Sequence, residues 1–211
     1  MARLVEFMGP PGTGKTATFK AAVLMRPMPN RWLTFDEVIA GRTPLASQND
    51  PLLKLAGRVL ASSQSTGDVK HRRFAATQVA LGRVQVVAAL VNPLVLTDES
   101  LLGWGLSFGL CQGVSQELLA EFFWKIPKPF HVIHYHSDEA TASRRNAGRV
   151  VRGRIDRFPD WRAATATALL AVDIMKQRGV RVTAMNAANE LKVNARETTL
   201  LMEELSAGRT P

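Results

Sequence analysis

The sequence predicts an α/β protein with a mostly parallel, doubly wound sheet of five strands. Short apolar runs of strand length alternate with longer stretches of helix-forming residues, which is typical of parallel strands joined by helices. The first apolar run, residues 4–8, leads directly into a glycine-rich loop and then into a helical stretch. The 211 residues are 46% hydrophobic and 21% charged, a composition typical of globular proteins with one core. We therefore expect a single domain over residues 1–211.

Each predicted strand is an apolar run bounded by turn residues or by an acidic residue, and each predicted helix is a stretch without breakers. The strands are expected at residues 4–8, 31–35, 93–97, 130–135 and 180–183. The helices are expected at residues 15–24, 52–61, 69–91, 114–124 and 138–145. Two more are expected, one from the end of the arginine-dense segment at residue 162 to about residue 178, and one from about residue 187 to 205.

Two segments are expected to lie outside this regular alternation. Residues 41–67 are rich in turn residues around one predicted helix, which indicates an inserted substrate cap at about residues 41–75. Residues 144–157 are dense in arginine, and Gly148 and Gly153 permit local movement, so we expect a lid in this segment.

The charge and the cysteine content limit the classes of function. Lys and Arg number 27 against 18 Asp and Glu, and the net charge of +9 favours a phosphate-rich partner, although an acidic protein would also fit. The only cysteine, Cys111, excludes an intramolecular disulfide framework and indicates a reducing compartment such as the cytoplasm. No run of 18 apolar residues occurs, so we expect neither secretion nor a membrane span.

The glycine-rich loop GPPGTGKT matches the Walker A pattern GxxxxGK[ST] and lies between a predicted strand and a predicted helix. Backbone amides in such a loop surround an anion, and the start of the helix adds positive potential. We expect ATP and Mg²⁺ as ligands, with Lys15 on the β and γ phosphates and the Thr16 hydroxyl on the metal. The residues expected to bind the nucleotide are Gly9, Pro10, Pro11, Gly12, Thr13, Gly14, Lys15 and Thr16.

A second part of the nucleotide site is expected after the third strand, where LVLTDE places Asp98 at a strand end. A carboxylate at this position can hold the metal through its water shell, whereas the alternative is a helix N-cap. Glu99 has two interpretations, because it can position a water for hydrolysis or complement the dipole of the following helix.

The residues of these motifs and the spacing between them indicate different classes of P-loop protein. The motif GPPGTGKT, followed by DE after a third strand, is common in AAA+ ATPases. AAA+ modules have a substantial segment before the loop and a helical lid domain after the core, whereas here the loop begins at residue 9 and Asp98 lies 82 positions after Thr16. The layout therefore resembles that of small P-loop kinases.

The kinase resemblance extends over most of the chain. TFDEVIAGR, residues 34–42, is similar to the strand-end Asp region of polynucleotide-kinase-like phosphotransferases, in which a carboxylate takes the proton of the attacking hydroxyl. The resemblance implies that Asp36 is this base, with Glu37 as the neighbouring alternative and a helix N-cap as the structural one. The runs KPFHVIHYHSDEATASRRNAGR and RVVRGRIDRFPDW resemble the strand, arginine helix and lid of the same kinases.

The arginines after the fourth strand follow from this resemblance. It implies that Arg144 and Arg145 bind ATP and that Arg145 and Arg149, four positions apart, stabilise the transferred phosphoryl group. A solvated basic surface is the alternative.

Two basic clusters carry more positive charge than the binding of one nucleotide requires, and they suggest the kind of acceptor. The segment 144–162 contains seven arginines and only two aspartates, and residues 70–73 form the second cluster. We therefore expect a nucleic-acid substrate, and one candidate acceptor is a 5′-hydroxyl end. The chain also resembles bacteriophage DNA kinases that phosphorylate 5-hydroxymethyluracil, which implies a modified base extruded from DNA as the other candidate. A phage enzyme of this kind would act in the host cytoplasm. The expected substrate-binding residues are Asp36, Arg42, Lys70, Arg72 and Arg73.

Two alternatives stay open at this point. A nucleoside or nucleotide kinase shares the same core and also uses arginines on acceptor phosphates. A DNA-associated, AAA+-like ATPase would use Glu99 to activate water and the basic surface to hold DNA.

Overall fold

The computed structural model describes residues 3–27, 31–41, 43–98, 100–150 and 160–208. Its strands are β1 (Arg3–Met8), β2 (Leu33–Thr34), β3 (Leu94–Thr97), β4 (His131–His136) and β5 (Arg181–Asn186). Its helices are α1 (Lys15–Met25), α2 (Phe35–Ile39), α3 (Pro51–Ser62), α4 (Gly67–Ala88), α5 (Leu101–Gly109), α6 (Gln116–Lys125), α7 (Glu139–Val150), α8 (Trp161–Gln177) and α9 (Leu191–Ser206).

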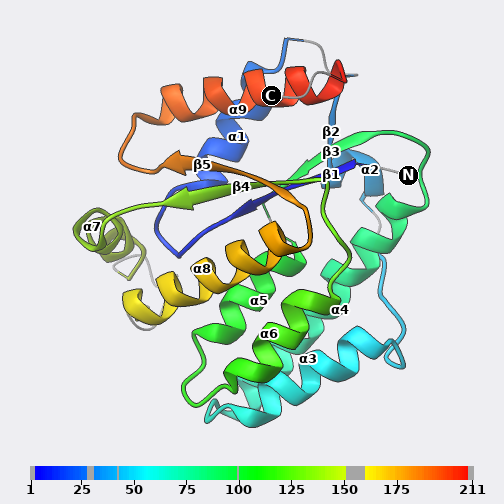
Figure 1. Cartoon of the computed structure of the whole chain (residues 1–211), viewed down its shortest axis with the longest axis vertical. Helices are drawn as coiled ribbons and strands as arrows, with labels where there is room; N and C mark the ends of the chain where they lie inside the picture. The colour runs from blue at the N-terminus through cyan, green and yellow to red at the C-terminus, as the bar shows by residue number, and fades with distance from the viewer. Residues whose placement is uncertain (1–2, 28–30, 42, 99, 151–159, 209–211) are drawn as a thin grey trace.

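The five strands form one parallel sheet in the order β2-β3-β1-β4-β5, with helices on both faces (Figure 1). Residues 3–6 of β1 pair with 94–97 of β3, and residues 5–8 pair with 131–134 of β4. The predicted α/β class and the five-stranded parallel sheet are therefore confirmed. Because all strands run the same way, the segments that follow β1, β2, β3 and β4 meet at one edge of the sheet.

The two faces of the sheet have separate cores, as side-chain alternation along a strand requires. Val5 and Phe7 of β1 face the layer formed by α1 and α9, which pack against each other. Leu4 and Met8 face the larger helical layer of α3 to α6 and α8 (Figure 1). Within the described residues, no helix has the length and apolar character that crossing a membrane requires.

The second strand differs from its prediction. Only Leu33 and Thr34 pair with β3, and α2 begins at residue 35, so the predicted strand 31–35 is too long. The reason is a capping box, in which the Thr34 hydroxyl accepts from the Glu37 amide and the Glu37 carboxylate accepts from the Thr34 amide. Asp36 consequently lies in the first turn of a helix rather than at the end of a strand.

One helix, α5, was absent from the prediction, which placed the helix after the third strand at residues 114–124. The sequence of α5, LLGWGLSFG, has three glycines, and glycine lowers helix propensity. Packing explains two of them, since a Cβ at Gly105 would collide with Phe123 of α6 and a Cβ at Gly109 with Thr167 of α8. Close approach of neighbouring helices therefore overrides the local preference.

Candidate functional site

The phosphate loop, residues 9–16, joins the carboxyl end of β1 to the first turn of α1. Gly9, Gly12 and Gly14 have φ values of 147°, 84° and 91°, at which a Cβ would be strained. Gly9 also lies against β4, where a Cβ would collide with the carbonyl oxygen of Tyr135. The first turn of α1 holds no acidic residue. The backbone thus forms an anion cradle at the positive end of a helix, which fits the phosphates of ATP.

The side chains of the loop point to the same use. The Lys15 ammonium donates to the carbonyl oxygens of Gly9 at 2.6 Å and Pro10 at 2.8 Å, so its charge lies on the loop. The buried Thr13 hydroxyl donates to the Pro10 carbonyl at 2.9 Å and braces the turn. Thr16 is exposed at the start of α1, where its hydroxyl could hold Mg²⁺ beside bound phosphates.

Arg145 of α7 ties the phosphate loop to the opposite part of the sheet. Its guanidinium donates to the Thr13 carbonyl at 3.0 Å and to the Ala187 carbonyl at 2.8 Å, in the turn between β5 and α9. A guanidinium nitrogen also lies 3.2 Å from the place of a Cβ on Gly14. The structure therefore places Arg145 on the loop, within the region where a nucleotide would bind.

Asp98 follows β3 directly and is half-buried. Because β3 pairs with β1, the carboxylate lies at the same sheet edge as the phosphate loop. Asp98 and Thr16 offer the hard oxygen ligands that Mg²⁺ prefers, so these two residues fit the predicted metal site. Glu99 lies outside the described residues.

A buried acid that the sequence analysis did not single out lies beside this edge. Glu6 of β1 is only 2% exposed, and its carboxylate accepts a hydrogen bond from the Ser100 hydroxyl at 2.5 Å. Burial raises the pKa of Glu6 to about 7, although the bonds from Ser100 and the Leu102 amide lower it. The sequence signal was a single acid within the apolar run LVEFM, residues 4–8, of a strand expected to be buried.

The fourth strand brings a histidine to the loop. His134 is paired in register with Met8, the last residue of β1, and is almost fully buried. Burial lowers the pKa of His134 to about 4, and the charges of His136, Lys176 and Lys15 lower it further. His134 is therefore neutral at physiological pH and adds no positive charge beside Lys15.

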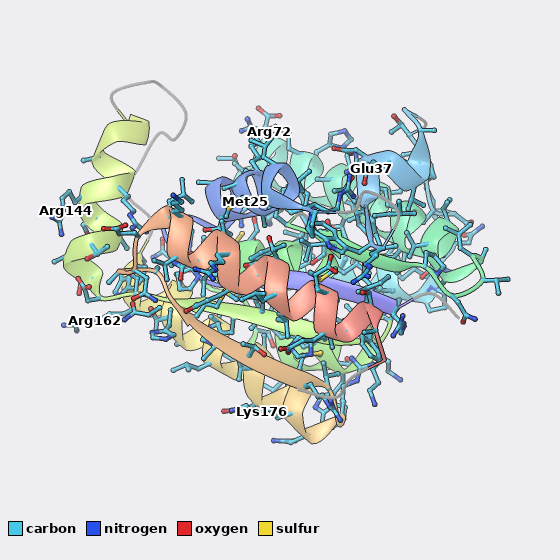
Figure 2. The ribbon with its side chains drawn as sticks, turned by 90° about the horizontal axis from the view of Figure 1, so that it is seen from above. Met25, Glu37, Arg72, Arg144, Arg162 and Lys176 are labelled. Carbon is cyan, nitrogen blue, oxygen red and sulfur yellow. The ribbon has the colours of Figure 1, made fainter. Side chains whose placement is uncertain are left out.

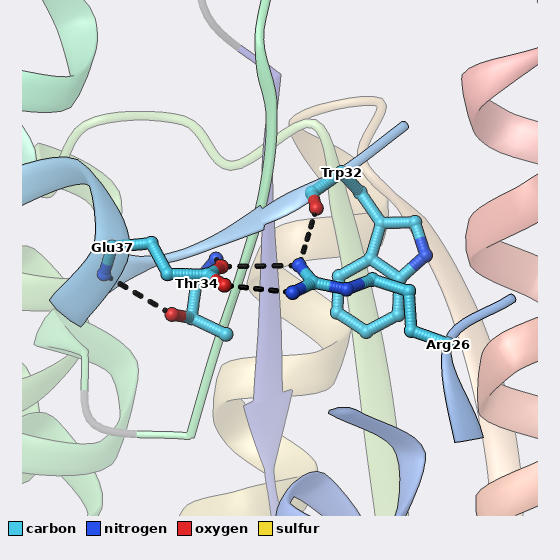
Figure 3. A network of polar contacts seen from close by, with 4 residues as sticks. All are labelled: Arg26, Trp32, Thr34 and Glu37. Carbon is cyan, nitrogen blue, oxygen red and sulfur yellow. Dashed lines mark hydrogen bonds and ion pairs between the residues drawn. The ribbon is translucent and has the colours of Figure 1, made fainter. Parts of the chain in front are cut away.

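The two neighbouring acids of α2 have different surroundings. The Glu37 carboxylate accepts from the Arg26 guanidinium at 2.7 and 3.0 Å and from the Thr34 amide at 2.7 Å (Figure 3). Arg26 also donates to the Trp32 carbonyl at 2.7 Å and lies over its ring. These contacts lower the pKa of Glu37, with the bond from Arg26 as the largest cause. Asp36 is exposed, so of the two acids it is the one whose carboxylate is open to an acceptor.

A pocket of about 220 Å³ lies between α4 and α5. Four of its residues are at helical spacing on α4, and Trp104 comes from the first turns of α5, a few residues after Asp98. The residues that line it are Ala76, Val79, Ala80, Arg83 and Trp104. The Nε of Arg83 is buried and has no hydrogen-bond partner among the described residues. The pocket therefore combines an apolar wall with an aromatic ring and an arginine, which suits a small polar molecule with a flat ring.

The predicted basic cluster of α4 is divided by the structure. Arg73 donates to the Ser107 carbonyl and, at 2.6 Å, to Cys111 Sγ, so its guanidinium serves the packing of α4 on α5. Arg72 is exposed and Lys70 is half-buried. Figure 2 shows Arg72 apart from Arg144, which lies on α7.

Two further predicted residues are not described. Arg42 and the side chain of Arg149 lie outside the described residues, as do positions 151–157 of the predicted lid.

No family model matches the sequence, and no curated protein matches it. Solved structures do match over nearly the whole chain. The structure of deoxyadenosine kinase from M. mycoides with the products dCMP and dCDP has a TM-score of 0.57 at 16% identity, covering 97% of this chain and 99% of that one. This chain has the fold of a nucleoside kinase. Structures of the same M. mycoides kinase with dATP and with dCTP give TM-scores of 0.55 and 0.53, at 15% and 14% identity, with coverage of 96% and 97% of this chain and 98% and 99% of theirs.

Proposed function

We propose that this protein is a phosphotransferase that uses ATP and Mg²⁺ to phosphorylate a hydroxyl group of a nucleoside or nucleotide. The observation that supports this most is the meeting of three features at one sheet edge: the phosphate loop, Asp98 after β3, and Asp36 after β2. The nucleoside-kinase fold of nearly the whole chain agrees with it. This interpretation was an alternative in the sequence analysis, and the structural neighbours support it better than a DNA acceptor.

The pocket between α4 and α5 is our candidate for the acceptor base. Trp104 lies in the helix that begins just after Asp98, and α2, which contains Asp36, packs against α4. A flat base can stack on the tryptophan ring, and Arg83, which lines the pocket, can donate from its guanidinium group to a base carbonyl or ring nitrogen. M. mycoides deoxyadenosine kinase holds deoxynucleotides in its structures, so deoxynucleosides and their monophosphates are the first acceptors to test.

The chemistry then assigns a task to each group. Asp36 accepts the proton of the acceptor hydroxyl while the oxygen of that hydroxyl bonds to the γ phosphorus of ATP. The bond between the γ phosphorus and the oxygen that bridges it to the β phosphate breaks, and ADP is released. Lys15 and Arg145 offset the negative charge that moves towards the leaving phosphate. Thr16 and Asp98 hold Mg²⁺, which when bound neutralises phosphate charge and aligns the triphosphate.

The test is transfer of label from γ-labelled ATP with Mg²⁺ to a panel of acceptors. The panel contains the four deoxynucleosides, their 5′-monophosphates, unmodified DNA with a 5′-hydroxyl end, and duplex DNA with 5-hydroxymethyluracil. We expect labelled nucleotide from one or more of the small acceptors. Label only on DNA would contradict the proposal and support the nucleic-acid kinase expected from the arginine clusters, whereas ADP formed equally with and without any acceptor would indicate an ATPase.

Asp36→Asn tests the base within the same assay. We expect transfer to fall by about 10²-fold or more while ATP binding is retained, because the carboxylate acts on the acceptor and not on the nucleotide. Asp173→Asn, which neutralises an exposed acid on α8, is the matched control and should keep wild-type transfer. Equal loss in both variants would remove Asp36 from the mechanism.

A further inference from the structure

Glu6 is an acid in the interior of the sheet, and no ion pair joins it to a basic side chain among the described residues. It lies on the central strand β1, paired in register with Thr97 of β3 and Val132 of β4. Alternation along β1 places it on the same face as Leu4 and Met8, towards α5. The groups that donate to its carboxylate are the Ser100 hydroxyl and the Leu102 amide. An apolar side chain at this position would avoid the free-energy cost of burying a carboxyl group, so the presence of an acid indicates a role other than packing.

The contacts of Glu6 replace a helix cap. Ser100 is the N-cap residue of α5, and its side chain makes no capping hydrogen bond to its own helix. It is completely buried and turned towards Glu6 instead. The Glu6 carboxylate accepts from the amide of Leu102, the second residue of α5, which is the amide that an N-cap side chain usually binds. The first turn of α5 is therefore capped from a neighbouring strand.

This arrangement fixes the segment that holds Asp98 at both ends. On one side, Thr97 is paired with Glu6 through the β1–β3 ladder. On the other, Ser100 is bonded to the Glu6 side chain. Three residues after Glu6 the same strand becomes the phosphate loop at Gly9. Asp98 is thus held relative to the loop by one buried residue of β1 that lies outside the loop.

We propose that Glu6 is a positioning residue that, through Ser100 and the first turn of α5, sets the place of Asp98 relative to the phosphate loop and so tunes the affinity of the nucleotide site for Mg²⁺. This inference rests on the proposed function, because it takes Asp98 as the metal ligand. Residues that orient a metal ligand commonly change metal affinity by about 10- to 100-fold when they are removed.

The experiment measures how strongly Mg²⁺ enhances the binding of ATP, by calorimetry with a nonhydrolysable ATP analogue over a series of Mg²⁺ concentrations. Three variants separate the contacts. Glu6→Leu removes both acceptors, Ser100→Ala removes one donor and leaves the carboxyl group, and Glu6→Gln keeps an acceptor oxygen. Ser63→Ala is the matched control, because Ser63 is also a buried serine whose hydroxyl donates to a helix carbonyl, at 2.8 Å, but it lies at the end of α3.

We expect the half-saturating Mg²⁺ concentration to rise by about tenfold in Glu6→Leu and about threefold in Ser100→Ala, with little change in Glu6→Gln and none in Ser63→Ala. Binding of the analogue without Mg²⁺ should stay close to wild type in all four, because the phosphate loop is intact. If Glu6→Leu does not fold, Ser100→Ala alone decides.

Unchanged Mg²⁺ dependence in Ser100→Ala, or loss of Mg²⁺-free binding as large as the loss with Mg²⁺, would overturn the proposal. Failure of the proposed function gives a different result. In that case wild-type protein binds the analogue with Mg²⁺ but phosphorylates no small acceptor, and the comparison of the variants still stands.

Discussion

Glu6 makes the stability of the protein depend on pH in an unusual direction. Burial raises its pKa from 4.5 in a free carboxyl group to about 7, so the folded state holds a proton that the unfolded chain releases between these values. The contribution of this group is complete below about pH 4.5, falls as the pH rises to 7, and is constant above. The difference between the two pKa values corresponds to about 3 kcal/mol.

Glu6→Gln tests this at the same residue. The amide has no proton to lose, so we expect its unfolding free energy to exceed that of wild type by an amount that grows from near zero at pH 4.5 towards about 3 kcal/mol at pH 8. Urea unfolding at several pH values measures the difference. His131 and His134, whose buried rings have pKa values of about 4, titrate in both proteins and cancel in the comparison. A difference that does not vary with pH would mean that Glu6 is ionised throughout.

Single residues also show how far the sequence could lead. The residues of the glycine-rich loop could be named from the sequence because they are contiguous, and their binding of phosphate stays a prediction. Asp36 was preferred to Glu37 only through the kinase resemblance, whereas the ion pair that occupies Glu37 comes from Arg26, which reaches it only in the folded chain. Arg83 belongs to no motif, and its place in the lining of the pocket is visible only in the packed structure.

At the scale of elements, the end of α1 is joined to the start of α2 by Arg26 and Glu37. The Arg26 side chain is 8% exposed and pairs with Glu37 in a two-pronged contact, whereas in the second ion pair, Arg31–Glu203, the arginine is 46% exposed. We expect a double-mutant cycle with Arg26→Met and Glu37→Gln to give a coupling of about 1 kcal/mol or more, against less than about 0.5 kcal/mol for Arg31 and Glu203. Urea unfolding of the variants measures both couplings. Equal values would mean that the first pair is no more than a surface contact.

A second link between elements is Arg145, which joins α7 to the phosphate loop and to the turn before α9. Arg145→Ala removes the bonds to the Thr13 and Ala187 carbonyls, and we expect ATP to bind about tenfold more weakly, since hydrogen bonds from charged donors contribute about 1.5–3 kcal/mol each and water replaces part of this. Arg162→Ala, an exposed arginine of α8, is the control for net charge. Calorimetric titration with ATP compares the two, and equal weakening would show a general effect of charge.

The elements that the sequence analysis missed have different causes. Helix α5 contains glycines because α6 and α8 approach it closely, and these neighbours are distant in the chain. Strand β2 is short because a capping box between Thr34 and Glu37, three positions apart, starts α2 after two paired residues. The pattern of apolar runs therefore predicted the sheet, whereas the prediction failed where a local cap or a tertiary contact decides the local structure.

At the scale of the whole molecule, the sheet topology brings the proposed nucleotide and acceptor regions together. The order β2-β3-β1-β4-β5 places Asp98 on the strand beside the phosphate loop and Asp36 one strand further. The basic cluster of α4 offers less charge to an acceptor than the sequence indicates, because Arg73 packs against α5. The net charge of the protein indicates an anionic partner but does not indicate the size of that partner. A pocket of about 220 Å³ suits a small molecule.

Ligand-linked stability tests this view of the molecule without requiring turnover. A ligand at 100 times its Kd stabilises the folded state by about 2.7 kcal/mol, which in a chain of this size raises the unfolding midpoint by roughly 5–10 °C. We expect such a shift with ATP and Mg²⁺, and an additional one with the correct deoxynucleoside or its monophosphate. Arg83→Met should abolish the second shift and keep the first, because Arg83 lines the pocket between α4 and α5 and is not part of the phosphate loop. If short DNA duplexes raise the midpoint while no small acceptor does, the pocket is not the acceptor site and the basic surface of α4 and α7 takes its place.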